Sequence, residues 1–230
     1  MFTLYQFDIS PFCDKVRRIL NVKGQDYAIR EVKISQAGRL RDISPSGKYP
    51  VLDHDGQRIS DSTDIAHYLE RLFPQPPLVP ADPHEAALVH VLEDWADESL
   101  YFQEMTMRLV WPQNAKHWAP ILLKDEGALF RMIGPRMVPK IAARQSKAQG
   151  TGRKSQAQII TDLERHADAV AGLLGARNYL VGKMLSLADI SVFAQLFCID
   201  GTPEGKAVID ARPGLRAWMT RVDQETCKRK

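Results

Sequence analysis

A proline-rich segment divides this sequence into two parts of different character. Residues 74–80 read Pro-Gln-Pro-Pro-Leu-Val-Pro, which cannot continue a helix and predicts a stiff, extended linker. Short strand-like runs alternate with helical patterns before this linker, whereas helical periodicity dominates after it. The sequence has 230 residues, enough for two ordinary domains. We therefore expect an α/β domain over residues 1–76 and an all-helical domain over residues 84–230.

The first part shows the element order βαβ followed by ββα. Residues 3–7 alternate as in a strand, and residues 27–32 have the pattern of a second strand. Pro11 lies between them and suits the first turn of a helix, where its missing N–H would have had no partner. A βαβ unit implies a parallel strand pair. Asp55-Gly56 between short apolar runs predicts a hairpin, and residues 65–73 predict a closing amphipathic helix. On the first helix we expect an apolar face of Phe12, Val16, Ile19 and Leu20 and a polar face of Asp14, Lys15, Arg17 and Arg18.

Capping residues mark the helices of the second part. Asp82 and Pro83 suit the N-cap and first position of a helix, and Ser186 and Asp189 have the spacing of a capping box before a very apolar run. We expect the helix in that run to be buried on all sides. Residues 146–155 are polar and contain glycine, which predicts an exposed loop. The helix after Asp82 should present an apolar stripe of Leu88, Val91, Leu92 and Trp95.

Composition and charge argue against several classes of protein. A net charge of +3 is small for this length, so we expect no nucleic-acid partner. No run approaches the roughly 18 apolar residues of a membrane span, and the first residues lack the features of a secretory signal. The three cysteines are dispersed and odd in number, which favours a reducing compartment, and no histidine or cysteine has metal-ligand spacing. We therefore expect a cytoplasmic protein without a metal.

Four short motifs, taken together, resemble one family. They are Ser10-Pro-Phe-Cys13, Gly47-Lys-Tyr-Pro-Val-Leu52, Asp61-Ser62 and Ser186-Leu-Ala-Asp189. In this order they resemble the cytosolic glutathione S-transferases with a serine-type active site. The resemblance implies a thioredoxin-like N-terminal domain that binds glutathione as co-substrate and a helical domain that contributes a site for a small electrophile. It also implies a homodimer.

The resemblance assigns the chemistry to Ser10. Proteins of this family bind glutathione so that its thiol becomes a thiolate, the nucleophilic form. A hydroxyl at the start of a helix can donate a hydrogen bond to that thiolate. The alternative is that Ser10 only caps the helix by accepting a backbone N–H. We expect Cys13 to be a buried structural residue, and the alternative is glutathione-dependent thiol transfer through its sulfur.

The resemblance also implies a set of contacts to glutathione. Tyr49-Pro50 corresponds to a cis peptide bond at which the backbone of residue 49 pairs with the cysteinyl part of the tripeptide. Ser62 would bind the α-carboxylate at a helix N-terminus, and Asp61 would face the neighbouring ammonium or simply cap that helix. The candidates for the glycyl carboxylate are Lys33, Gln36, Arg39, Arg41 and Lys48, of which the register favours Gln36. The full set of expected contacts is Phe12, Gln36, Tyr49, Pro50, Asp61 and Ser62.

The second substrate should bind between the two domains. The candidate pocket residues are Tyr101, Met105, Arg108 and Trp111, whose spacing equally suits core packing. The favoured activity is attack of the glutathione thiol on a small electrophile. A different class of function is a binding or regulatory protein that keeps the fold without the chemistry. Retention of the expected glutathione contacts favours real glutathione binding.

Overall fold

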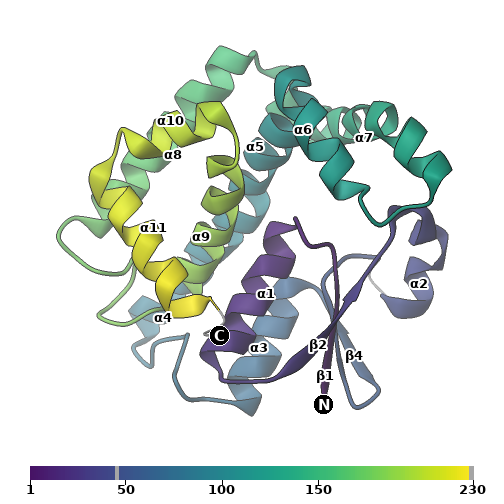
Figure 1. The fold of residues 1–230 in the computed structure, drawn as a ribbon. Coiled ribbons are helices and arrows are strands. Elements are labelled where there is room, and N and C mark those ends of the chain that lie inside the picture. Colours follow the sequence, from purple (N-terminus) through teal and green to yellow (C-terminus); the bar gives the residue numbers. More distant parts are fainter. Residues whose placement is uncertain (45–46, 228–230) are drawn as a thin grey trace.

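A computed structural model describes residues 1–44 and 47–227, with the side chains of residues 37–41 outside that description. In the first part, four strands form one mixed sheet in the order β2-β1-β3-β4 (Figure 1). β1 is parallel to β2 and antiparallel to β3, which pairs with β4. The parallel pair and the hairpin are as predicted. The strands are β1 (Phe2–Gln6), β2 (Tyr27–Glu31), β3 (Val51–His54) and β4 (Gln57–Ser60).

A two-residue turn fixes the register of the hairpin. Asp55 and Gly56 both have positive φ, 52° and 93°, as a turn of the type preferred between right-twisted strands requires. This turn pairs His54 with Gln57 and Val51 with Ser60. As a result Val51, immediately after Pro50, is buried beside β1.

Helices α1 (Pro11–Val22) and α3 (Ser62–Leu72) complete this part, with the short helices η1 (Ile34–Arg39) and α2 (Leu40–Ile43) between β2 and β3. Val16, Ile19 and Leu20 of α1 are buried, as predicted. The polar face of α1 was predicted wrongly, because Lys15 and Arg18 are buried too. Both side chains form ion pairs with acidic groups of the second part, which covers this face of α1.

The second part is entirely helical among the described residues and packs on the first through α1, which contacts α9 and α11 (Figure 1). Residues 83–110 form one continuous helical stretch that includes two π-helical segments, η2 and η3. The elements are α4 (Pro83–Trp95), η2 (Ala96–Leu100), α5 (Tyr101–Met105), η3 (Thr106–Val110), α6 (Pro112–Leu122), α7 (Ala128–Gln149), η4 (Thr151–Arg153), α8 (Gln156–Leu174), α9 (Leu187–Asp200), α10 (Pro203–Asp210) and α11 (Pro213–Thr226).

The start of α4 agrees with the sequence, but its buried face agrees only in part. The Asp82 carboxylate accepts the N–H groups of the next two non-proline residues, as an N-cap should. Of the predicted apolar stripe, Leu92 and Trp95 pack against the core. The other two members were predicted wrongly, because Leu88 is 40% and Val91 61% exposed, whereas Val89 and Glu93 are buried. The face that is turned inward contains an acidic residue because a cation of α1 meets it there.

The expected loop at residues 146–155 begins later than predicted. Helix α7 continues to Gln149, and the loop is confined to the residues between it and α8. Ser146 is small enough to lie on the buried side of α7, where its hydroxyl bonds Thr106. The prediction failed because polarity was taken to mean exposure.

The apolar helix α9 connects the two parts. Nearly all of its residues are buried, as predicted. The Asp189 carboxylate accepts the N–H and hydroxyl of Ser186, the N–H of Leu180 at 2.8 Å and the indole N–H of Trp218 at 2.9 Å. The capping box therefore also anchors the preceding loop and α11. A single apolar cluster extends from the sheet through α1 into these helices.

Candidate active site between the domains

Ser10 is the last residue before α1 and occupies its N-cap position, with extended backbone angles. Among the described residues its hydroxyl accepts no backbone N–H of the helix, so the simple capping role is not observed. The hydroxyl therefore lies at the positive end of a helix dipole without being committed to that helix.

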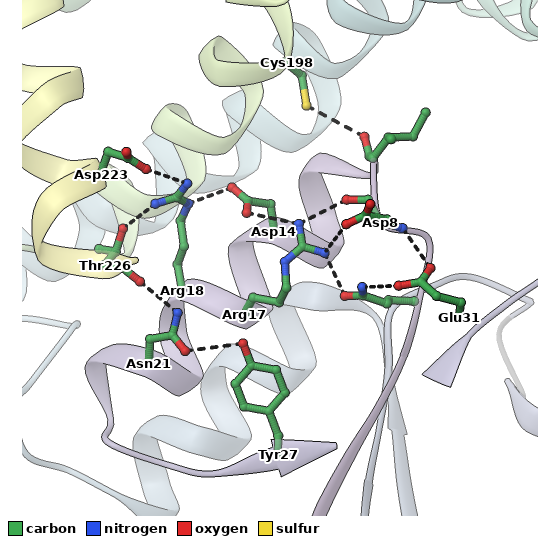
Figure 2. Close-up of polar contacts among 12 residues, drawn as sticks. Asp8, Asp14, Arg17, Arg18, Asn21, Tyr27, Glu31, Cys198, Asp223 and Thr226 are labelled. Atoms are coloured by element: carbon green, nitrogen blue, oxygen red, sulfur yellow. Dashed lines mark hydrogen bonds and ion pairs between the residues drawn. The ribbon is translucent and has the colours of Figure 1, made fainter. Parts of the chain in front are cut away.

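Both domains hold the loop that ends at Ser10. The guanidinium of Arg17 donates to the Asp8 carbonyl at 3.1 Å, and two N–H groups of Arg108 donate to the Ile9 carbonyl at 3.1 and 3.2 Å. The Cys198 thiol approaches the same Ile9 carbonyl at 3.9 Å (Figure 2). The Ser10 N–H donates to the Phe7 carbonyl at 3.0 Å. The carbonyls of Phe7, Asp8 and Ile9 and the N–H of Ser10 thus have fixed partners, which set the position of the Ser10 hydroxyl.

Arg17 links the loop to the sheet (Figure 2). Its guanidinium also donates to Gln6 at 2.7 Å and to Asp14 at 3.1 Å. Gln6 in turn donates to Glu31 on β2 at 2.6 Å, and Glu31 accepts the N–H of Asp8 at 3.1 Å. Charged hydrogen bonds of this kind are stronger than neutral ones. The network joins the ends of β1 and β2 to the first turns of α1.

Arg18 links α1 to the last helix (Figure 2). It donates to Asp14 and to the Thr226 hydroxyl, both at 2.6 Å, and pairs with Asp223 at 2.9 Å. Its guanidinium lies 4.3 Å from the ring centre of Phe193 on α9, a cation–π distance. The orientation of α1, and with it the position of Ser10, is therefore fixed by α9 and α11.

The Cys13 thiol is fully buried one turn into α1. Burial raises its pKa to about 11, although the N–H of Phe7 and the Ser10 hydroxyl act in the opposite direction. Burial also raises the pKa of the Cys198 thiol. Because only a thiolate is a good nucleophile, Cys13 is in the wrong protonation state for thiol transfer near neutral pH.

The peptide bond between Tyr49 and Pro50 is cis, as the resemblance implies. The sequence left the Tyr49 side chain unexplained. In the structure its ring packs edge-on against Phe7, with ring centres 5.4 Å apart. Its hydroxyl is buried without a hydrogen-bond partner among the described residues, and burial raises its pKa. The Tyr49 side chain thus packs against the loop before Ser10. Because the side chain is used in this contact, the backbone of residue 49 is the group available to a peptide ligand.

Asp61 lies in a strained backbone conformation at the start of α3. Its φ is 84°, which is uncommon for a residue with a side chain. The carboxylate accepts the N–H of Thr63 at 3.0 Å and pairs with Lys48 at 3.2 Å. Asp61 therefore caps α3, one of the two roles considered from the sequence. Its second oxygen faces a cation, so the carboxylate can hold a positively charged group.

Ser62 contacts a buried ionic cluster that the sequence did not reveal. Lys15 pairs with Asp97 at 2.8 Å and with Glu93, and all three are buried. The Ser62 hydroxyl donates to Asp97 at 3.4 Å and accepts from Lys15 at 3.5 Å. The cluster has one cation and two carboxylates, and desolvation raises the pKa of Asp97 despite the neighbouring lysine. With the hydroxyl turned inward, the N–H groups of the first turn of α3 are the donors suited to a ligand carboxylate.

A signal for this cluster exists in the sequence. Lys15 follows Pro11 by four residues and precedes Ile19 by four, so it lies on the ridge that faces inward. Glu93 and Asp97 are also four apart and lie on the same face as the buried Val89. Oppositely charged residues on two inward faces indicate a buried pair.

Of the expected second-substrate residues, only Tyr101 is partly exposed, and its ring packs 4.7 Å from that of Phe12. Met105, Arg108 and Trp111 are buried. Arg108 pairs with the buried Glu104 and lies 4.3 Å from the ring centre of Trp118. Its charge is therefore already neutralised, which removes the reason to expect an acidic substrate.

Gln36 is exposed on η1, where its side chain accepts the N–H of Lys33 at 3.4 Å. Of the four cations considered for the glycyl carboxylate, Lys33 and Lys48 are exposed, and the side chains of Arg39 and Arg41 lie outside the described residues. Over the described part of the chain, no group of three or more His, Cys, Asp and Glu residues is arranged to hold a metal ion. No helix in residues 1–44 and 47–227 is long and apolar enough to span a bilayer.

Comparison with known proteins gives the family. Residues 4–77 match the family model "Glutathione S-transferase, N-terminal domain", and residues 153–221 match "Glutathione S-transferase, C-terminal domain". The four-stranded mixed sheet and the helical domain packed on α1 match the architecture of this family's structures. The chain belongs to the glutathione S-transferase family.

The relatives include enzymes and a protein named for its location. The chain is 31% identical over 192 residues to protein LigF of Sphingobium, covering 80% of this chain and 73% of LigF. The crystal structure of LigF, described as a β-etherase, superimposes with a TM-score of 0.73 and covers 96% of this chain and 94% of that one, at 27% identity. Isoprene-epoxide–glutathione S-transferase of Rhodococcus is 24% identical over 228 residues, with 95% and 93% coverage. FtsZ-localized protein A of Caulobacter vibrioides is 28% identical over 203 residues, with 86% and 77% coverage.

Proposed function

We propose that this protein is a glutathione transferase in which the Ser10 hydroxyl activates the glutathione thiol for attack on a small electrophile. The observation that carries the proposal is the state of that hydroxyl, which makes no capping bond although it stands at a helix N-terminus. A hydroxyl in this position can donate its proton to a thiolate bound beside it. Membership of the family supplies glutathione as the co-substrate.

The energies support this assignment. Lowering a thiol pKa by about two units requires about 2.7 kcal/mol of preferential stabilisation of the thiolate. A hydrogen bond to a charged group contributes about 1.5–3 kcal/mol, and a helix N-terminus adds about 0.3–1 kcal/mol. One hydroxyl that is held rigidly at a helix start is therefore enough. The bonds from Arg17 and Arg108 to the loop supply the rigidity.

We further propose that glutathione lies along the start of α1 and α3. The backbone at the cis Tyr49–Pro50 bond would pair with its cysteinyl part. The N–H groups at Ser62 would bind the α-carboxylate, and Asp61 would take the ammonium in place of Lys48. Phe12 and Gln36 would complete the site, and the electrophile would enter beside Tyr101.

Two alternatives make different predictions. Thiol transfer through Cys13 is disfavoured because that thiol is buried and its pKa is raised. A binding protein without transferase chemistry is favoured by the similarity to FtsZ-localized protein A, whose name describes a location rather than a reaction. Direct measurement of thiolate formation separates these alternatives.

The test is a titration with reduced glutathione by calorimetry, with the ultraviolet absorbance of the bound thiolate followed in parallel. The wild type should bind saturably and develop the thiolate signal below pH 8. Ser10→Ala should still bind but lose the signal, and the control Cys13→Ala should keep both. No binding at millimolar glutathione would leave a protein with the fold alone. Binding without a thiolate signal in the wild type would indicate a non-catalytic glutathione-binding protein.

We also propose a cytoplasmic homodimer. Leu72 on α3 and Leu88 and Val91 on α4 are large apolar residues with at least 40% of their surface exposed in the single chain. The absence of disulfides among the three free cysteines fits a reducing compartment. Sedimentation equilibrium should give twice the mass of one chain. The variant Val91→Glu should sediment with the mass of a single chain.

A further inference from the structure

Helix α7 has an unusual charge composition. Its 22 residues include the basic residues Arg131, Arg136, Lys140, Arg144 and Lys147 and no acidic residue. None of the five forms an ion pair with any other described residue. The chain as a whole carries only +3. The positive charge is therefore concentrated on this helix without internal neutralisation.

Only a narrow face of α7 is used for packing. Gly134, Val138, Ala142 and Ser146 are buried, and they are small enough to bring the helix close to η3 and α6. The next outward residues are large and apolar, although they are exposed to solvent. Their exposed fractions are 62% for Leu129, 65% for Met132, 36% for Ile133, 43% for Met137 and 51% for Ile141.

The apolar and basic residues form neighbouring ridges. Leu129, Ile133, Met137 and Ile141 are four residues apart and follow one side of the helix. Arg136, Lys140 and Arg144 are also four apart and form the adjacent ridge. A 22-residue helix is about 33 Å long. The result is a long apolar edge with a row of cations beside it, at the outer rim of the helical domain (Figure 1).

We propose that this face of α7 docks on an anionic lipid surface. The apolar side chains would enter the boundary between headgroups and acyl chains, and the basic ridge would contact the lipid phosphates. This is the composition of a helix that lies in the membrane interface rather than one that spans it. The proposal concerns α7 alone and is independent of the reaction at Ser10.

Charge and shape favour a lipid surface over other occupants. A second copy that met α7 with its own α7 across a two-fold axis would bring two sets of five unpaired cations together. A folded acidic protein would need a groove that is complementary in shape to the protruding apolar and basic ridges of α7. Lipid headgroups conform to such a ridge, and they supply many negative charges over its whole length.

The experiment is co-sedimentation of the full chain with sucrose-loaded vesicles at low salt. Vesicles of phosphatidylcholine with 30% phosphatidylglycerol should carry the protein down, and pure phosphatidylcholine should not. Each basic residue near an anionic surface contributes roughly fivefold to the partition coefficient. The variant Arg136→Glu/Lys140→Glu/Arg144→Glu should therefore bind at least about 100-fold more weakly. Met137→Ser/Ile141→Ser should weaken binding while leaving its salt dependence unchanged.

A matched control makes the same change of net charge elsewhere. Arg30, Arg71 and Lys183 are exposed, and Arg30→Glu/Arg71→Glu/Lys183→Glu should retain most of the binding. Circular dichroism checks that each variant is folded. If the glutamate variant of α7 does not fold, the same three residues are replaced by glutamine and the vesicle assay is repeated with that variant. An equal loss of vesicle binding in the control variant would overturn the proposal, because the change in net charge alone would then explain the loss. Binding of soluble polyglutamate through α7 without vesicle binding would overturn it in favour of an acidic protein partner.

Discussion

The buried cluster of Lys15, Glu93 and Asp97 offers the sharpest test of how the two domains are joined. Lys15 lies on α1, and the two carboxylates lie on the first long helix of the helical domain. Replacing Lys15 by methionine keeps most of the side-chain volume but leaves two buried carboxylates facing each other. Breaking a buried ion pair on one side destabilises a protein by about 3–5 kcal/mol. We expect a loss of that size for Lys15→Met at pH 8.

The loss should depend on pH in a definite direction. Desolvation already raises the pKa of the Asp97 carboxyl, and Lys15 is the main group that opposes this rise. Removing the lysine therefore raises the pKa of Asp97 further in the folded chain, so that the folded variant binds more protons than the unfolded variant at mildly acidic pH. Its free energy of unfolding then falls as the pH rises through that raised pKa. The difference from the wild type should be smaller at pH 5 than at pH 8.

The assay is urea unfolding at both pH values, with the slope against urea checked for each variant. Lys206→Met is the matched control, because Lys206 also pairs with a carboxylate, that of Asp210 at 3.1 Å, but is exposed. It should change stability little, since exposed pairs contribute little. A loss below about 1 kcal/mol for Lys15→Met, or an equal loss at pH 5 and pH 8, would refute the assignment of a buried, uncompensated ionic cluster.

Three other outcomes can be measured directly. In the native protein the exposed Cys227 should react with a disulfide reagent within minutes, whereas Cys13 and Cys198 should react only at the rate of unfolding; a second fast thiol would contradict their burial. Burial raises the pKa of Cys13 from its ordinary value of 9.0 to about 11 in the folded chain. The free energy of unfolding should therefore fall between pH 9 and 11 by up to about 1.4 kcal/mol per pH unit, and Cys13→Ala should lack this slope in alkaline denaturation. Arg108→Met should destabilise the chain by about 3 kcal/mol or more by stranding a buried carboxylate, and thermal unfolding of Glu104→Gln/Arg108→Met should recover part of that loss.

Local signals predicted most of the fold. Pro11 and Pro83 begin helices because their backbone suits a first turn and their missing N–H has no partner to lose there. Asp55-Gly56 forms the hairpin turn because both residues tolerate positive φ. Ser186 and Asp189 are near neighbours in the sequence and satisfy each other. In each case the structure depends on residues a few positions apart, which a sequence displays directly.

Contacts between the domains were not predictable in the same way. Lys15 was expected at the surface because lysine is rarely buried, and its partners are 78 and 82 positions away. Leu88 and Val91 were expected in the core because they are apolar, yet the covered side of α4 is the side that packs on α9 and meets Lys15 of α1. The hydrophobic pattern identifies an amphipathic helix, but a long-range partner decides which residues of that helix are buried.

The candidate site shows the same division between local and distant determinants. The motif around Ser10 was visible because it is contiguous, but its geometry depends on residues from elsewhere. Arg108 is 99 positions from the Ile9 carbonyl that it binds, and Cys198 is 189 positions away. Because the loop is bonded to both domains, a rearrangement of the helical domain would move the Ser10 hydroxyl relative to the cis Tyr49–Pro50 bond. In the proposed reaction, the helical domain would therefore contribute to thiol activation by holding this loop, in addition to any contact with the electrophile.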